Sequence, residues 1–325
     1  MRFGGLLLKT EEKIMAEVSA KLVKQLRDET GAGMMECKKA LTESNGDYDE
    51  AIEYLRKNGQ AKAEKKAGRI AAEGLCDVAL DGNKAAVVEV NSETDFVANN
   101  ADFKAYVHAV ALQALHTSAT DMDGFFADKW ESDPSKTVKE ALTDEIAVIS
   151  ENLSIRRFKQ ITADDGAVVS YVHGGGRIAV LVHAKAANVT DGVKEALTNV
   201  AMQVAAMNPK YVSDKDVDQE FLDHEREIIM AQIENDPKES QKPQNVKEGM
   251  VKGRISKELK EVCLMDQIYV KAEDGKQSVG KYLETVAKAE GTDLSIVEFV
   301  RFETGEGIEK KNENFAEEVA KQING

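Results

Sequence analysis

Residues 76–90 read CDVALDGNKAAVVEV, and this stretch decides the fold class. Apolar side chains alternate with others on both sides of Asp81-Gly82-Asn83; they are Cys76, Val78, Leu80, Ala86, Val88 and Val90. Two alternating runs around such a turn indicate a β-hairpin. The next segment has helical spacing instead, with an apolar face of Phe103, Tyr106, Val107, Val110, Ala111 and Ala114.

The hairpin and helix occur a second time. Apolar residues at 168–172 and 178–182 flank Gly174-Gly175-Gly176, and a second helix is expected at 191–207. The hairpin glycines Gly82 and Gly174 are 92 positions apart. A further echo links 137–158 to 278–299, where a Thr or Ser, Val, Leu, Leu-Ser-Ile and Phe pattern recurs at a constant offset of 141. We therefore expect a duplicated α/β unit of hairpin, helix, helix and closing strand.

The two offsets differ by 49 residues, so a segment of that length is inserted between the helices of the second copy. Residues 210–259 fit it, because a seam at spacings of four and three (Val217, Phe221, His224, Ile228, Ala231) predicts one helix. A second helix follows Pro243, with Val246, Met250, Val251, Ile255 and Leu259. We expect an antiparallel helical hairpin that depends on a partner or a second copy.

Residues 16–60 predict three short helices, the last one ending at Asn58-Gly59. A bundle this small buries a modest core, so it serves as a docking module. A basic stretch follows, with Lys62, Lys65, Lys66 and Arg69. It is either a solvated helical linker or a contact surface for an acidic partner.

Both ends of the chain carry further segments. Residues 1–14 are interpreted as a dispensable extension, a tag or an early start, with Met15 as the natural beginning, because the apolar run is too short for export. After Gly305-x-Gly307 an amphipathic helix is expected, with Phe315, Ala316, Val319, Ala320 and Ile323.

The composition excludes several classes of protein. Lys plus Arg number 43 against 58 Asp plus Glu, a net charge of −15, which argues against a protein that binds nucleic acid directly. Three separated cysteines give neither a disulfide framework nor a zinc site, and a reducing, cytoplasmic location fits best. No apolar run reaches the roughly 20 residues that a membrane span needs.

Enzyme signatures are incomplete. His173-Gly174-Gly175-Gly176 is similar to a lipase oxyanion loop, but the chain has no G-x-S-x-G elbow. Gly275 to Lys281 imitates a phosphate loop, yet Tyr282 stands where Ser or Thr must hold magnesium, so a loop and a helix start are expected. The five histidines form no H-E-x-x-H motif. We expect no catalysis, no metal and no cofactor; a hydrolase is a remote alternative that turnover of an ester would reveal.

Residues 91–99, NSETDFVAN, lie where the first hairpin leads into its helix. One interpretation is an aromatic side chain, Phe96, held out beside the carboxylate of Asp95 for a partner. The other is a helix start, with Thr94 or Asp95 as the cap and Phe96 packed as a staple. The residues alone favour the helix start.

Three motifs follow one another along the chain, TGAGMMECKKAL at 30–41, TDFVA at 94–98 and HGGGRI at 173–178. Together they closely resemble the translation elongation factor Ts family, from about Met15 to the C-terminus. Ser92, where the family commonly has cysteine, and Ala179, where it usually has glycine, depart from the pattern. The segment 117–136 is longer than in the short members of that family, so the resemblance does not define the local loop structure there.

The repeat and the resemblance predict the same α+β layout. Its parts are an extension (1–14), a ubiquitin-associated-like three-helix bundle with linker (15–69), core subdomain N (70–162), core subdomain C (163–209 and 260–304), an inserted helical hairpin for dimerisation (210–259) and a C-terminal helical module (305–325). The two core subdomains are a duplicated α/β pair with antiparallel strands, and the inserted hairpin is a short coiled coil.

The resemblance implies a guanine-nucleotide exchange factor of elongation factor Tu, the GTPase that delivers aminoacyl-tRNA to the ribosome. It places Thr94, Asp95, Phe96 and Val97 in the partner's G domain beside the magnesium site, which favours the presented Phe96 over the staple. It assigns further partner contacts to Arg27, Met34, Met35, Lys38, Lys66 and His173. A homodimer through the helical hairpin is possible.

The alternative function is a ubiquitin-type adaptor without exchange activity, because the N-terminal bundle resembles ubiquitin-binding modules. It leaves the duplicated core unexplained. A pull-down that recovers ubiquitin but no GTPase favours it.

Overall fold

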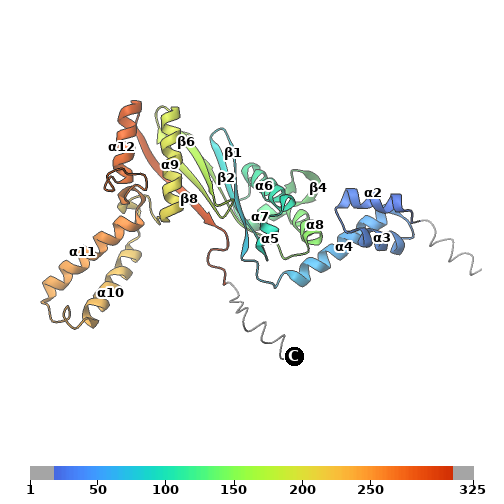
Figure 1. Ribbon diagram of the computed structural model, residues 1–325, viewed down its shortest axis with the longest axis horizontal. Coiled ribbons are helices and arrows are strands. Elements are labelled where there is room, and N and C mark those ends of the chain that lie inside the picture. The colour runs from blue at the N-terminus through green and yellow to red at the C-terminus, as the bar shows by residue number, and fades with distance from the viewer. Residues whose placement is uncertain (1–17, 310–325) are drawn as a thin grey trace, which may run out of the picture. The chain divides into compact units, whose positions relative to one another are not determined.

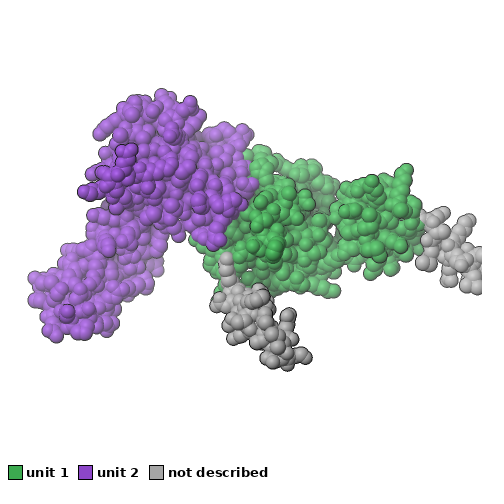
Figure 2. Space-filling view, in the orientation of Figure 1, with its two compact units in different colours: residues 1–75, 89–157, 304–325 green, residues 76–88, 158–303 purple. Residues whose placement is uncertain are grey.

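The computed structural model describes residues 18–309 (Figure 1). The predicted extension (1–14) and the predicted helix with Phe315 to Ile323 lie outside the described residues. The chain forms two compact units, coloured separately in Figure 2. Unit 1 holds the chain up to Leu75, Glu89–Arg157 and the chain from Thr304; unit 2 holds Cys76–Val88 and Phe158–Glu303.

Unit 1 begins with the three expected helices, α2 (Ala20–Thr30), α3 (Met34–Glu43) and α4 (Tyr48–Lys66). Gly31 ends α2 at φ 68°, a conformation that favours glycine. Asp47 caps α4 by accepting from the Glu50 amide at 2.9 Å. Their buried core consists of Val23, Leu26, Cys37, Ala40, Leu41 and Ala51.

The predicted end of the third helix at Asn58-Gly59 is wrong, because α4 continues to Lys66. Gly59 is buried, and a Cβ there would lie 3.4 Å from the Cβ of Ala147 in α8 (Val138–Ile149). A glycine in a helix interior lowers stability without ending the helix, and this one lies where α4 packs against α8. An ion pair between Arg56 Nη2 and Glu140 Oε1 (2.9 Å) joins the same two helices.

The rest of unit 1 surrounds α6 (Ala101–His116), the helix predicted after the first hairpin. The long segment 117–136 contains α7 (Met122–Ala127), β3 (Lys129–Trp130) and most of β4 (Asp133–Thr137). Trp130 is buried there, with its ring centroid 5.9 Å from that of Tyr106. The segment thus covers one side of α6.

Two three-stranded sheets share one plan. The first has the order β1 (Glu73–Asp81), β2 (Lys84–Ser92), β5 (Ser154–Thr162); the second has β6 (Gly166–His173), β7 (Ile178–Ala186), β8 (Leu294–Glu303). In each sheet a hairpin pairs with a strand that comes much later in the chain. Both predicted hairpins are confirmed. The second sheet is antiparallel throughout, with Tyr171 opposite Val180 and Val182 opposite Phe299.

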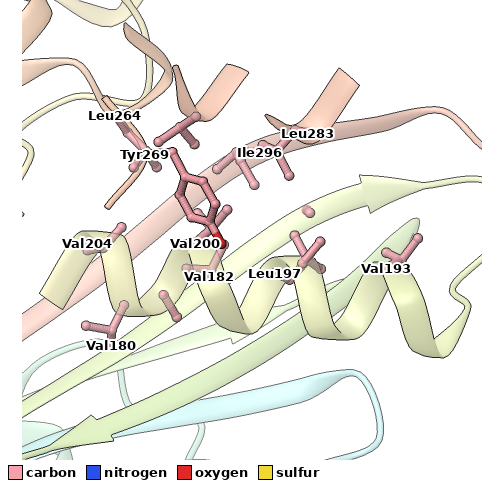
Figure 3. Packing of buried hydrophobic residues seen from close by; sticks show 14 of the residues in the cluster. Val180, Val182, Val193, Leu197, Val200, Val204, Leu264, Tyr269, Leu283 and Ile296 are labelled. Carbon is pink, nitrogen blue, oxygen red and sulfur yellow. The ribbon is translucent and has the colours of Figure 1, made fainter. Parts of the chain in front are cut away.

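In unit 2 the helix α9 (Asp191–Met207) has the predicted bounds and packs on the second sheet with α12 (Val279–Glu290). Figure 3 shows Leu197 and Val200 of α9 among side chains such as Val182, Leu283 and Ile296. The imitation phosphate loop is the start of α12, as expected, and Ser278 caps it by accepting from the Lys281 amide.

The inserted hairpin consists of α10 (Gln219–Asn235) and α11 (Gln244–Val262), which pack side by side (Figure 1). Short 3₁₀ turns flank it at Asp214–Asp216 and Leu264–Asp266. The predicted seam of α10 is wrong: His224, Ile228 and Ala231 are exposed, whereas Ile229 and Ile233 are buried. Ile228, Ile229 and Met230 are consecutive apolar residues, so spacing alone does not show which of them faces the partner helix. The predicted seam included Ile228, whereas the buried face of α10 contains Ile229. In α11 the predicted Met250, Val251 and Ile255 do pack inward.

This mixture of helices and antiparallel sheets agrees with the predicted α+β class. Among the described residues, no helix is long and apolar enough to cross a membrane. The domain boundaries given above stay a prediction.

Candidate functional site

The corner between β2 and α6, residues 93–100, carries the most exposed large apolar side chain described. Phe96 is 85% exposed and lies in the short helix α5 (Asp95–Ala98), whose one buried residue is Ala98. Thr94 caps α5, because its Oγ1 accepts from the Val97 amide at 3.4 Å. The helix-start interpretation is therefore correct for Thr94 and wrong for Phe96, which does not pack as a staple.

The corner is held by hydrogen bonds to residues 151–152, just after α8. The Glu151 carboxylate accepts from the amides of Glu93 and Thr94, each at 3.1 Å, and from the Thr94 hydroxyl at 2.6 Å. In return the Glu93 carboxylate accepts from the Asn152 amide at 2.6 Å and lies 3.4 Å from Arg69 Nη1. Bonds to charged groups are the stronger kind, so the exposure of Phe96 occurs on a fixed backbone.

The strand that leads into the corner is also fixed. Glu89 of β2 is fully buried, and its carboxylate accepts from Arg156 Nη1 (3.0 Å), Arg157 Nε (2.6 Å) and the Gly305 amide (2.8 Å). A buried carboxylate is tolerated when it is paired and hydrogen-bonded in this way. At the end of β2, Ser92 is buried and donates to the Thr94 carbonyl at 3.0 Å.

The four predicted corner residues thus have two roles in the structure. Thr94 and the half-buried Val97 build the corner, whereas Asp95 and Phe96 are exposed. The Asp95 backbone carbonyl accepts from both the amide and the side chain of Asn99, and the Asp95 side chain is exposed. An apolar ring and a carboxylate at neighbouring positions suit a protein partner more than a small substrate.

The predicted N-terminal contacts gather on the three-helix bundle. Arg27 is exposed in the last turn of α2, and Met34, Met35 and Lys38 are exposed on α3, Met35 by 73%. Exposed methionines are flexible apolar side chains that can adapt to different contacts, and here they lie beside exposed basic residues.

Lys66, at the end of α4, is different because it is half-buried and its Nζ lies 3.5 Å from the Ile146 carbonyl of α8. Burial, with the charges of Lys62 and Arg69, lowers the pKa of Lys66. Of the basic stretch, Lys62, Lys65 and Lys66 lie in α4, whereas Arg69 lies in the turn that follows it. Lys62 pairs with Glu36 of α3 within the same unit.

His173 lies in unit 2, at the end of β6, opposite Ile178. Its Nδ1 is 2.9 Å from the Tyr171 hydroxyl, and the two rings are 5.9 Å apart. The turn that follows has Gly174, Gly175 and Gly176 at φ 60°, 67° and 102°, where other residues are strained. The turn therefore requires this glycine run.

Sequence reasoning missed Glu151 and Asn152, which hold the corner, and it named Arg69 only as part of the basic stretch. Glu151 is 57 positions from Thr94, and only the fold brings α8 beside the corner. No short motif could have indicated that contact. Within residues 18–309 no group of three or more His, Cys, Asp and Glu side chains is arranged to hold a metal ion.

Fold and site define an α+β protein whose outstanding surface feature is one aromatic side chain held out on a hydrogen-bonded corner. A model of the family "Elongation factor TS" matches residues 93–306. Elongation factor Ts of Clostridium novyi (strain NT) is 50% identical over 309 residues, covering 94% of this chain and 99% of that protein. Elongation factor Ts of Clostridioides difficile (strain 630) is 49% identical over 311 residues, covering 95% and 100%. The chain belongs to the elongation factor Ts family, which is a family of translation elongation factors.

Proposed function

We propose that this chain is the guanine-nucleotide exchange factor of elongation factor Tu and works in the cytoplasm. It binds the GDP form of that GTPase, disturbs the magnesium and phosphate site, and promotes GDP release so that GTP can bind. The factor acts by binding and performs no covalent chemistry. The observation that carries the proposal is Phe96, 85% exposed on a corner held by charged hydrogen bonds.

An exposed Phe on a fixed backbone is a source of binding free energy. Burying such a side chain in a partner contributes about 1.5–3 kcal/mol, and a stiff corner loses little entropy when it is bound. In a GTPase, magnesium and the phosphates hold each other in place. A ring inserted beside that site displaces the groups that coordinate magnesium, and the neighbouring Asp95 carboxylate stabilises the displaced polar groups.

The other predicted contacts supply affinity for the strained, nucleotide-free partner. They are Arg27, Met34, Met35, Lys38, Lys66 and His173. By linkage, the factor weakens nucleotide binding by the same ratio as nucleotide weakens binding of the factor. A coupling of about 1–3 kcal/mol corresponds to roughly 5–150-fold.

The helical hairpin is proposed as the surface for a second copy of the chain. Ile228 of α10 and Val246 of α11 are 38% and 41% exposed, which supports an apolar contact there. Sedimentation of the Ile228→Lys variant tests this: a shift toward monomer supports the homodimer, and an unchanged species argues against it.

The exchange proposal is tested by stopped-flow release of a fluorescent GDP from elongation factor Tu. The wild-type chain is expected to accelerate release strongly, and Phe96→Ala to slow the accelerated release far more than it weakens complex formation. Release that is equally fast with Phe96→Ala contradicts the role of the ring. Absence of acceleration by the wild type contradicts the function itself.

A further inference from the structure

We infer that Glu151 is the positioning residue of the exchange site, acting on Phe96 through the hydroxyl of Thr94. The inference rests on the proposed exchange function. Glu151 lies outside the motif that presents the ring, and its carboxylate is bonded to the backbone before α5 and to the N-cap of that helix.

The hydroxyl of Thr94 makes two hydrogen bonds of defined direction at the cap of α5. The Thr94 hydroxyl has one proton, and at 2.6 Å it donates that proton to Glu151 Oε1. The lone pairs of the hydroxyl then face the Val97 amide, which donates to Thr94 Oγ1 at 3.4 Å. The carboxylate thereby orients the hydroxyl as an acceptor, which is the role that an N-cap requires.

The backbone before the cap is bonded to the same carboxylate. Glu151 Oε2 accepts from two consecutive amides, Glu93 and Thr94, each at 3.1 Å. The two oxygens of one carboxylate therefore fix both the path into α5 and its cap. Without this carboxylate, three donors at the corner lose their acceptor.

The helix α5 has little stability of its own. It has four residues, of which only Ala98 is buried. A helix this short is unstable without its caps, because nucleation is costly and packing contributes little. The direction of Phe96 is therefore set mainly by the bonds around Thr94.

A Thr cap bonded to a Glu carboxylate also occurs in unit 2. Thr190-Asp191-Gly192-Val193 matches Thr94-Asp95-Phe96-Val97 except at the third residue. The Thr190 hydroxyl donates to Glu290 Oε2 at 2.5 Å and accepts from the Val193 amide at 3.1 Å. Here the cap begins α9, which has 17 residues and a buried face, and a Cβ on Gly192 would lie 2.2 Å from Glu290 Oε1. Glu290 is therefore a matched control, with the same bond to a Thr cap and no ring to position.

The experiment measures the rate of fluorescent GDP release from elongation factor Tu against the concentration of the full chain. Each titration gives a plateau rate and a half-saturating concentration. For Glu151→Ala we expect a plateau about tenfold lower, with the half-saturating concentration changed by less than about twofold. Glu151→Gln keeps a carbonyl oxygen for the two amides and is expected to retain at least about half of the wild-type plateau.

Glu290→Ala separates positioning from simple destabilisation. A destabilised chain has a smaller folded fraction, so its half-saturating concentration rises while its plateau stays at the wild-type value. For Glu290→Ala we therefore expect the wild-type plateau, and for Glu151→Ala a lower plateau. If Glu151→Ala does not fold, Thr94→Val removes the hydroxyl, and with it both the bond to Glu151 and the cap of α5, while the two backbone amides keep Glu151 as acceptor. This variant is expected to lower the plateau in the same way.

The double variant Phe96→Ala/Glu151→Ala completes the test. If Glu151 acts through the ring, the double variant has the plateau of Phe96→Ala alone. A further tenfold fall, or a wild-type plateau for Glu151→Ala, overturns the inference while Phe96→Ala can still support the exchange function. If the wild type does not accelerate release, both the exchange function and the positioning role fail.

Discussion

The two Thr-Asp-x-Val corners of this chain have the same kind of N-cap, but the helices that they begin differ in length and burial. In unit 2 four residues, 187–190, connect β7 to α9, and the cap starts a long helix that is buried on one side. In unit 1 eight residues, 93–100, connect β2 to α6, and the cap starts a short helix that presents Phe96. The exposed site therefore arises where a helix-capping motif is separated from the hydrophobic core.

The separation has an energetic consequence. Residues near the first corner are held by hydrogen bonds to charged groups and little by packing, whereas α9 is held by a hydrophobic core. Changes around Phe96 should therefore alter exchange and leave folding intact. Changes around α9 should do the reverse.

The largest difference is expected from Leu197→Ala compared with Phe96→Ala. Leu197 is fully buried in the core of unit 2, so its truncation should lower the free energy of unfolding by about 2–5 kcal/mol. Phe96 is exposed, so its truncation should change that free energy by less than about 0.5 kcal/mol. Urea denaturation followed by circular dichroism measures both. Similar losses for the two variants would break the comparison.

A smaller difference is expected between the two capping threonines. Thr190→Val removes the N-cap of α9 and should cost about 1–2 kcal/mol of stability, with no change in the plateau rate of GDP release. Thr94→Val should cost less, because α5 buries one residue, and should lower the plateau. Thermal melts and release titrations on the same samples separate the effects. A lower plateau with Thr190→Val contradicts this division.

The smallest expected effect concerns pH and is confined to unit 1. Burial, then the charges of Asp102 and Asp144, raises the pKa of Glu145 from 4.5 to about 7. Between those pH values the folded chain holds a proton that the unfolded chain has lost, so stability falls as pH rises from 4.5 to 7. The position 141 residues later is Val286, which does not titrate.

Glu145→Gln should remove this dependence. Because Glu145 is partly exposed, the gain above pH 7 should be about 1 kcal/mol. Urea denaturation of both proteins at several pH values between 4.5 and 8 measures this gain in the free energy of unfolding. Parallel pH profiles for wild type and Glu145→Gln contradict the assignment.

Helices and strands were predicted from the sequence more accurately than the contacts between them. Alternation around Gly82 and Gly174 predicted both hairpins, and helical spacing predicted α6 and α9, because these signals are local. The prediction at Gly59 was wrong because the sequence does not distinguish a glycine inside a helix from one that ends a helix. The predicted seam of α10 was wrong because Ile228 and Ile229 are adjacent, and only the packing against α11 shows which of the two is buried.

The candidate site shows the same limit. The exposed corner is visible in the sequence as TDFV, and the resemblance gave it a role that local patterns alone did not favour. Glu151 could not be predicted, since its bonds join residues 57 positions apart. A side chain that positions another across the fold leaves no periodic signal in the sequence.

The most direct test of the account follows the side chain at position 96 itself. Phe96→Trp places an indole at the corner, and the only other tryptophan of the chain, Trp130, is buried and provides a constant background. The emission of the free variant should be that of an exposed indole. On binding nucleotide-free elongation factor Tu, the difference spectrum against the wild-type complex should shift to shorter wavelength, and excess GDP should reverse the shift. A complex that forms while the emission stays that of an exposed indole contradicts the insertion of this side chain into the partner.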